Sequence, residues 1–406
     1  MWNFEPAQKI PGTNRVMSVE TTEARALAIL ALVPITRISD VAPLDRLGLP
    51  AFSAVTPLAA DLTSHMGKGR DAVSAKVSAI MEAVERVSAE APAPGTTRRA
   101  SFAELARDAG NDVIDPASLT LPGDSAYRPD TMFTWVHSHD LIADRPVWMA
   151  SDLVTNPPVE GILHEVDTNG LAAGNTRLEA IVHGLCEVME RDAWSQNEFV
   201  TLFADEGDQE PAQRWIDLET LQDDAGSWVE RIRSAGFDLV LHDITNDLGV
   251  ATVQALLTDP EYVTSSGHRP MHFQGMGTHP CAATAVFRAI SEAVQARLSV
   301  IQGARDAYNT TPYSTRSYTK ARRAEQLAPR ADIAFSDVVS VWHDDLLGDL
   351  EFLIDRLLGA GFEELIVTDL TQQRLDIPVV RVRVPGLSAF VVNRRRVDWR
   401  CLRHLL

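Results

Sequence analysis

Five glutamates on two segments of the chain have a spacing that could bring their carboxylates together around a cation. Glu82 and Glu85 lie on one segment, and Glu179, Glu187 and Glu190 lie on another. On an α-helix, Glu179 and Glu190 would lie within about 20° of each other, with Glu187 roughly 60–80° around the axis. Clustered acids raise each other's pKa or repel unless a cation joins them. Mg²⁺ prefers such hard oxygen ligands and shares them with nucleotide phosphates, so the spacing indicates a magnesium–nucleotide site.

The competing interpretation is a solvated helix face whose acids pair with basic residues one turn away. Arg86 lies four residues after Glu82 and favours that interpretation for Glu82. Glu85, in contrast, has no basic residue three or four positions away. The second acidic segment also follows a loop with Gly170 and Gly174, where free backbone N–H groups could meet an anion. From helix geometry alone, both interpretations remain open.

Three shorter motifs have spacings that argue against a catalytic role. The Gly-Lys-Gly run at 67–69 lacks Walker A spacing, and we expect its lysine to lie on a turn. The Gly-Met-Gly run at 275–277 is too short for a dinucleotide fingerprint, and we expect no clean strand–helix unit after it. In the His-Pro-Cys run at 279–281, a turn or buried cysteine at a helix start is favoured over a nucleophile.

Composition excludes several functional classes. The 406 residues include 37 Lys+Arg against 56 Asp+Glu, a formal net charge of −19. Such a chain would repel nucleic acid, so no nucleic-acid partner is expected. No stretch approaches about 20 uninterrupted apolar residues, so no membrane partner is expected. Three sparse cysteines without paired spacing, and no secretory signal, predict a cytoplasmic protein.

Long helices must position the acids. Alanine- and leucine-rich periodic patterns predict helices over 22–32, 71–90, 175–198, 282–302 and 346–358. The second, third and fourth of these each carry Glu or Gln with a nearby Arg, a weak internal similarity that suggests duplication.

Short strands alternate with these helices. They are predicted over 35–41, 50–55, 133–137, 146–150, 237–243, 251–258, 366–369 and 379–384. Hairpin-like strand pairs among them predict an α+β (mixed α/β) fold with antiparallel pairing.

Three blocks of sequence resemble the motifs of the YcaO family, and together they cover most of the chain. Residues 64–69 and 78–86 are similar to the family's GKG block and SxxxExxE motif. Residues 167–193 resemble its NxxxExxxxxxxExxxR block. Residues 288–306 resemble its third block, an Arg–Glu–Gln helix that ends in a GxRD-like turn.

The N-terminal segment resembles the YcaO members that work with a TfuA protein. The similar runs are residues 9–15, 21–22, 35–37 and 44–50. Azoline-forming members often end in a PxPxP tail, whereas residues 401–406 contain no proline. The resemblance therefore favours the thioamide-forming branch.

The resemblance implies a YcaO-like duplicated fold with antiparallel sheets and long helices flanking a nucleotide cleft. Residues 1–60 would form an N-terminal segment packed on the core, and 61–406 the catalytic domain, with two similar lobes that divide near 91–130. The implied cofactors are ATP and Mg²⁺. The metal ligands would be Glu82, Glu85, Glu179, Glu187 and Glu190. The implied nucleotide- or metal-binding residues are Lys9, Ser78, Glu82, Glu85, Asn175, Glu179, Glu187, Glu190, Arg191 and Arg305.

The activity implied by the resemblance is ATP-dependent phosphorylation of a peptide backbone amide oxygen. The expected outcome is a thioamide, with a sulfur donor, a TfuA-like partner, a precursor peptide or protein as substrate, and a homodimeric enzyme. Three alternatives stay open: an azoline-forming cyclodehydratase acting on Cys, Ser or Thr, a non-catalytic partner-binding scaffold, and a metal-dependent hydrolase. No general base is evident from the sequence.

Overall fold

The computed structural model describes residues 4–93, 95–110, 112–163, 167–204, 213–264, 267–303 and 324–406. Within these ranges, none of the helices combines the length and the apolar character needed to cross a membrane. The predicted Arg305 lies outside the described residues.

Eight α-helices have both ends within the described residues, and four of the predicted helices lie within a few residues of their expected bounds. The predicted 22–32 helix is displaced and runs from residue 19 to 28 instead. The helices are α1 (Val19–Ala28), α2 (Ala72–Ala89), α3 (Phe102–Ala109), α4 (Arg177–Phe203), α5 (Asp223–Ser234), α6 (Ala282–Gln302), α8 (Leu346–Gly359) and α9 (Trp399–Leu402). Short 3-10 helices occupy Ala42–Leu44, Pro116–Leu119, Ser151–Leu153, Leu218–Thr220 and Phe335–Asp337.

Three antiparallel sheets hold the strands of the described residues. The first has the order β1 (Arg37–Asp40), β2 (Ala51–Val55), β3 (Ser64–Lys68). The second has the order β11 (Gly267–Thr278), β10 (Thr252–Thr264), β9 (Asp238–Asp243), β8 (Arg214–Trp215). The third has the order β4 (Thr97–Ser101), β5 (Met132–Asp140), β12 (Ile366–Asp369), β13 (Val379–Arg383), β7 (Leu171–Ala173), with β6 (Arg145–Ala150) paired to β5. These pairings confirm the predicted mixed fold with antiparallel sheets.

Two strands with a Gly-x-Gly run pack directly on the helix that follows them. A Cβ on Gly67 of β3 would lie 2.1 Å from the backbone of Ala75 and Ala79 in α2. A Cβ on Gly275 of β11 would lie 2.2 Å from the backbone of Ala289 and Ala293 in α6. Glycine is required at both positions because nothing larger fits between strand and helix.

These contacts correct two predictions. The run at 275–277 lies within strand β11, which leads into α6, so it does belong to a strand–helix unit. Lys68 does not lie on a turn but ends strand β3. The two glycine runs therefore serve close strand–helix packing, and the repeated unit of strand and helix agrees with the weak internal similarity of the sequence.

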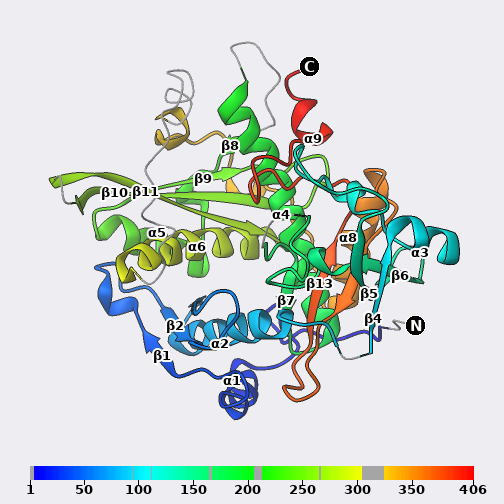
Figure 1. The fold of residues 1–406 in the computed structure, drawn as a ribbon. Coiled ribbons are helices and arrows are strands. Elements are labelled where there is room, and N and C mark those ends of the chain that lie inside the picture. The colour runs from blue at the N-terminus through cyan, green and yellow to red at the C-terminus, as the bar shows by residue number, and fades with distance from the viewer. Residues whose placement is uncertain are drawn as a thin grey trace.

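Helix α4 occupies the centre of the molecule. It packs on α8, on β7 and β13 of the third sheet, and on β11 of the second sheet. In the view of Figure 1, α6 lies directly below the second sheet, on which it packs, and α2 lies lower than α6. Most residues of α4 are buried, so its polar side chains are held in fixed positions.

The predicted boundary at residue 60 lies in the connection between β2 and β3, which pair along their full length. Residues 37–55 thus share a sheet with the residues that follow. The predicted division into two similar lobes near 91–130 stays a prediction.

Candidate functional site

One face of α4 carries the polar side chains of the candidate site. Glu179, His183, Glu187 and Arg191 follow one another at intervals of four residues, and Glu190 lies on the same side. Thr176 caps the helix, because its hydroxyl accepts a hydrogen bond from the Glu179 N–H. The cap fixes where the helix begins and therefore which side chains share this face.

Glu85 of α2 joins this face through a backbone contact. Its Oε1 accepts a hydrogen bond from the Ala173 N–H at 2.8 Å, at the end of β7. Burial is the main cause that raises the pKa of Glu85 to about 8, and the charges of Glu82 and Glu187 add to it. Glu82 accepts a hydrogen bond from the Met66 N–H at 3.0 Å. Acids from α2 and α4 thus lie close enough to influence each other.

A second group of charges surrounds the C-terminal part of the face. Burial raises the pKa of Glu187 to about 7, against the lowering effect of Arg191. Burial also raises the pKa of Glu190, and Glu292 of α6 adds to the rise. The Lys68 ammonium lies 2.5 Å from Glu292. Three helices therefore contribute to one cluster of acids and cations.

Sequence reasoning did not assign Glu292, Arg288 or Lys68 to the site. Arg288 of α6 acts on the pKa of both Glu187 and Glu190, so it belongs to the same cluster. The pattern of Glu or Gln with a nearby Arg that α6 shares with α2 and α4 points to Glu292, whereas it gives no signal for Arg288 or for Lys68 on β3.

Glu179 and Asn175 lie together at the N-terminal part of the face. Glu179 forms an ion pair with Arg15 at 2.6 Å and accepts a hydrogen bond from Asn175 Nδ2 at 3.2 Å. Thr22 donates a hydrogen bond to Asn175 Oδ1 at 2.9 Å. Glu179 precedes Glu187 by about 12 Å along the helix axis. Glu179 is therefore held by Arg15 of the N-terminal segment. The predicted role of Glu179 as a metal ligand stays a prediction.

Arg15 links this end electrostatically to the rest of the face. Its charge, together with those of Arg288 and Lys68, helps to lower the pKa of His183 well below the ordinary value, with burial as the largest cause. The polar face is therefore continuous from Glu179 towards Arg191.

Lys9 and Ser78 are the two remaining predicted site residues within the described part of the chain. The Lys9 ammonium is buried, 2.5 Å from Asp349, and donates a hydrogen bond to the His343 carbonyl at 2.9 Å. Ser78 lies one turn before Glu82 on α2 and is half-buried. The predicted nucleotide contacts of both residues stay predictions.

The residues present fit a divalent cation that is shared with phosphates. Among the described residues, no three His, Cys, Asp or Glu side chains form a group that could hold a metal ion. However, Glu190 Oε2 and Arg288 Nε are both buried, and neither has a hydrogen-bond partner among the residues that the structure describes. An unsatisfied acceptor favours a cation and an unsatisfied donor favours an anion. A magnesium ion coordinated partly by phosphate oxygens would satisfy both.

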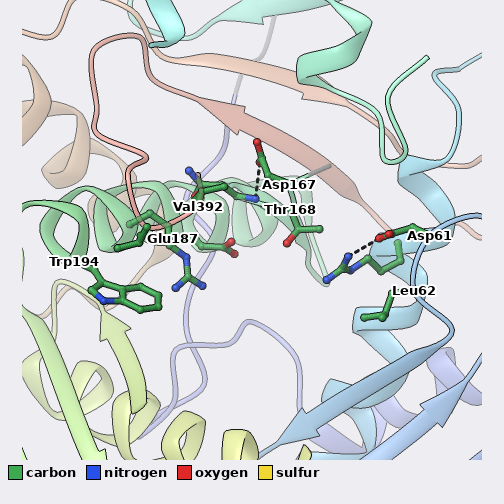
Figure 2. Close-up of a pocket in the computed structure, with 11 residues that line it drawn as sticks. Asp61, Leu62, Asp167, Thr168, Glu187, Trp194 and Val392 are labelled. Atoms are coloured by element: carbon green, nitrogen blue, oxygen red, sulfur yellow. Dashed lines mark hydrogen bonds and ion pairs between the residues drawn. The ribbon is translucent and has the colours of Figure 1, made fainter. Parts of the chain in front are cut away.

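A pocket opens beside this cluster, between α2, α4 and three loops that contain residues 61–62, 167–169 and 391–392. Its volume is about 390 Å³, and Glu187 and Arg191 form part of its wall. Figure 2 shows Glu187 between Trp194 on one side and Asp61 and Leu62 on the other. Sequence reasoning missed this pocket, because its walls come from segments far apart in the chain.

Comparison with known proteins identifies the family. A family model described as YcaO cyclodehydratase, ATP- and Mg²⁺-binding, matches residues 66–388. This chain belongs to the YcaO family. An uncharacterized protein of Methanothermobacter thermautotrophicus is 36% identical over 391 residues, which cover 91% of this chain and 94% of that protein. A protein of Rhizobium leguminosarum bv. trifolii, described as lying in the tfuA 3′ region, is 31% identical over 370 residues, 87% of this chain and 84% of that protein.

Solved structures of YcaO proteins share the fold. The YcaO protein from Methanopyrus kandleri, bound with AMPPCP and Mg²⁺, aligns with a TM-score of 0.73 at 27% identity and covers 95% of both chains. A heterocyclase in complex with substrate and cofactor aligns with a TM-score of 0.75 at 23% identity. That alignment covers 96% of this chain but 54% of the heterocyclase, so this chain spans about half its length.

These findings confirm the predicted family and fold, and they confirm ATP and Mg²⁺ as the ligands of the family. The tfuA-region relative agrees with the predicted TfuA-associated branch. This YcaO protein therefore belongs with ATP-dependent cyclodehydratase-type enzymes.

Proposed function

We propose that this YcaO protein uses ATP and Mg²⁺ to phosphorylate a backbone amide oxygen of a precursor peptide or protein, and that the product is a thioamide. The observation that carries the proposal is the set of mostly buried acids with raised pKa values, Glu85, Glu187 and Glu190, beside Arg191 and Arg288. Acids in such a setting are costly without a cation, and guanidinium groups suit phosphate. Both requirements are met by a magnesium nucleotide.

In this proposal Glu82, Glu85, Glu187 and Glu190 hold Mg²⁺, with Glu179 as a further ligand. Arg191, Arg288 and Lys68 orient the phosphates. When bound, Mg²⁺ neutralises charge that develops on the transferring phosphoryl group. The Ala173 N–H keeps the Glu85 carboxylate directed towards α4.

The overall reaction is balanced with hydrosulfide as the sulfur donor. A carbon–sulfur bond forms at the amide carbonyl, and the amide oxygen takes the γ-phosphoryl group of ATP as ADP departs. The carbon–oxygen bond then breaks, so the oxygen leaves on phosphate and the proton of hydrosulfide is carried away with it. The products are a thioamide, ADP and phosphate, and no oxidant or reductant is required.

Support for the thioamide branch comes from the relative in the tfuA 3′ region. For this reason the proposal includes a TfuA-like partner that delivers sulfur. It also includes a cytoplasmic location and a homodimeric assembly. Size-exclusion chromatography with light scattering would test the assembly.

The second candidate is an azoline-forming cyclodehydratase, which the description of the family favours. In that reaction a Cys, Ser or Thr side chain of the substrate attacks the preceding amide. The two reactions differ in their need for external sulfide and in the mass of the product.

The decisive experiment incubates the protein with ATP, Mg²⁺, sulfide, a TfuA-like protein and a genomically neighbouring peptide. Mass spectrometry should show exchange of one oxygen for sulfur, only with sulfide present. Loss of one water without sulfide would instead establish the cyclodehydratase. Absence of Mg²⁺-dependent AMPPCP binding in calorimetry would refute both and leave a non-catalytic scaffold, whereas metal binding without nucleotide would favour a hydrolase.

A further inference from the structure

The pocket beside Glu187 shares Glu187 and Arg191 with the predicted nucleotide residues and extends beyond them along α4. Those residues run along the helix face from Glu179 to Arg191, whereas the pocket starts at Glu187 and continues to Trp194. Glu179 precedes Glu187 by about 12 Å along the axis, and Trp194 follows it by about 10 Å. Glu187 and Arg191 thus stand at the boundary between two binding regions on one helix.

A boundary position has a chemical consequence. Glu187 and Arg191 belong to the acid–guanidinium cluster that we assign to Mg²⁺ and phosphate. A molecule in the adjoining pocket would contact the same two residues from the other side. Since the proposed reaction transfers a phosphoryl group, the pocket is placed where the acceptor of that group must bind.

The acids in the remaining pocket wall are already paired. Asp61 accepts hydrogen bonds from Arg86 Nη1 and Asn156 Nδ2, both at 2.6 Å. Asp167 accepts a hydrogen bond from Arg383 Nη2 at 3.0 Å.

These pairs leave little attraction for a charged ligand. Burial would raise the pKa of Asp167, but the charges of Arg383, Arg381 and Arg396 outweigh it and keep the pKa below its ordinary value. A charged ligand group would have to break one of these pairs, so the wall favours an uncharged ligand.

The wall also offers apolar surface and one unsatisfied acceptor. Leu62, Trp194 and Val392 line opposite sides of the opening (Figure 2). Asn169 also lines it, and its side-chain oxygen is buried without a hydrogen-bond partner among the described residues. An acceptor beside apolar walls matches a peptide N–H flanked by small neutral side chains.

We propose that this pocket binds the acceptor peptide through an uncharged stretch of backbone, with the amide to be modified next to Glu187 and Arg191. This inference rests on the proposed function, which supplies the chemistry. The volume of the pocket, about 390 Å³, lies at the lower end of ordinary ligand pockets and suits a short segment of backbone rather than a large side chain.

The test uses acetyl-triglycine amide as a neutral backbone probe, with saturation-transfer NMR on the full chain in Mg²⁺ and AMPPCP. The Val392→Trp variant fills the pocket, and Val397→Trp is the matched control, since Val397 is 41% exposed and lies outside the pocket wall. We expect the probe to bind the wild type and Val397→Trp equally and Val392→Trp at least about tenfold more weakly. Probes with a central Asp or Lys should also bind about tenfold more weakly.

Four results would overturn the proposal. Three concern the probes: no binding of the neutral probe to the wild type, unchanged binding of that probe to Val392→Trp, or equal binding of the charged probes. The fourth is a parallel loss of AMPPCP affinity in Val392→Trp, which would assign the pocket to the nucleotide. If Val392→Trp does not fold by circular dichroism, Leu62→Trp fills the opposite wall. If AMPPCP fails to bind the wild type, the proposed function fails, and probe binding without nucleotide still decides the fate of the pocket.

Discussion

The Glu85→Gln variant should make the metal-free protein more stable, and more so at high pH. Burial and neighbouring charges raise the pKa of Glu85 from the ordinary 4.5 to about 8. An acid with a raised pKa holds its proton more tightly in the folded state, so the folded protein loses stability as the pH rises from 4.5 towards 8. Glutamine removes the charge, and its side-chain oxygen can still accept the Ala173 N–H.

The size of the effect follows from the two pKa values. Relative to wild type, the Glu85→Gln variant should gain about 2 kcal/mol at about pH 6 and about 4–5 kcal/mol at about pH 8.5. At roughly 2.1 cal/mol/K of unfolding entropy per residue, these gains raise the Tm of a 406-residue chain by about 2 °C and about 5 °C.

The assay is thermal unfolding by circular dichroism in a chelator at both pH values. Glu104→Gln is the matched control, because the Ser101 backbone hydrogen bond is the main cause that lowers the pKa of Glu104. Removing that charge should bring no gain at either pH. The reasoning is refuted if Glu85→Gln is no more stable than wild type, or if its gain does not grow with pH.

Further outcomes follow from the same structure. Because the acids of raised pKa must lose protons to hold a metal, Mg²⁺–AMPPCP affinity should rise as the pH increases from about 6 to about 9, measured by calorimetry in matched buffers. Lys68→Met should weaken AMPPCP binding about tenfold, whereas Lys76→Met, which breaks the ion pair between Lys76 of α2 and Glu23 of α1, should not; equal losses would argue against a phosphate role. Gly67→Ala should cost about 3 kcal/mol or more of stability, because its Cβ would overlap the α2 backbone, whereas Gly123→Ala meets open space and should be neutral in the same melts.

The sequence by itself determined which side chains share a face of the same helix. The positions of Glu82 and Glu85 on α2, and of Glu179, Glu187 and Glu190 on α4, follow from a fixed rotation per residue. The bounds of four long helices could be predicted to within a few residues, because the apolar spacing and caps that stop a helix are local. The helix predicted at 22–32 lies at 19–28 instead, and α5 was not predicted. The family motifs are also local, so membership of the family, and ATP and Mg²⁺ as the ligands of that family, could be predicted.

Only the tertiary structure decided which of these side chains meet across distant segments. In the folded chain, Lys68 forms an ion pair with Glu292, Lys9 with Asp349, and Arg15 with Glu179. None of these pairs has a periodic signal, because each depends on how separate helices and loops pack. The pocket beside Glu187 has the same origin, since its walls are brought together by folding and no single stretch of sequence contains them.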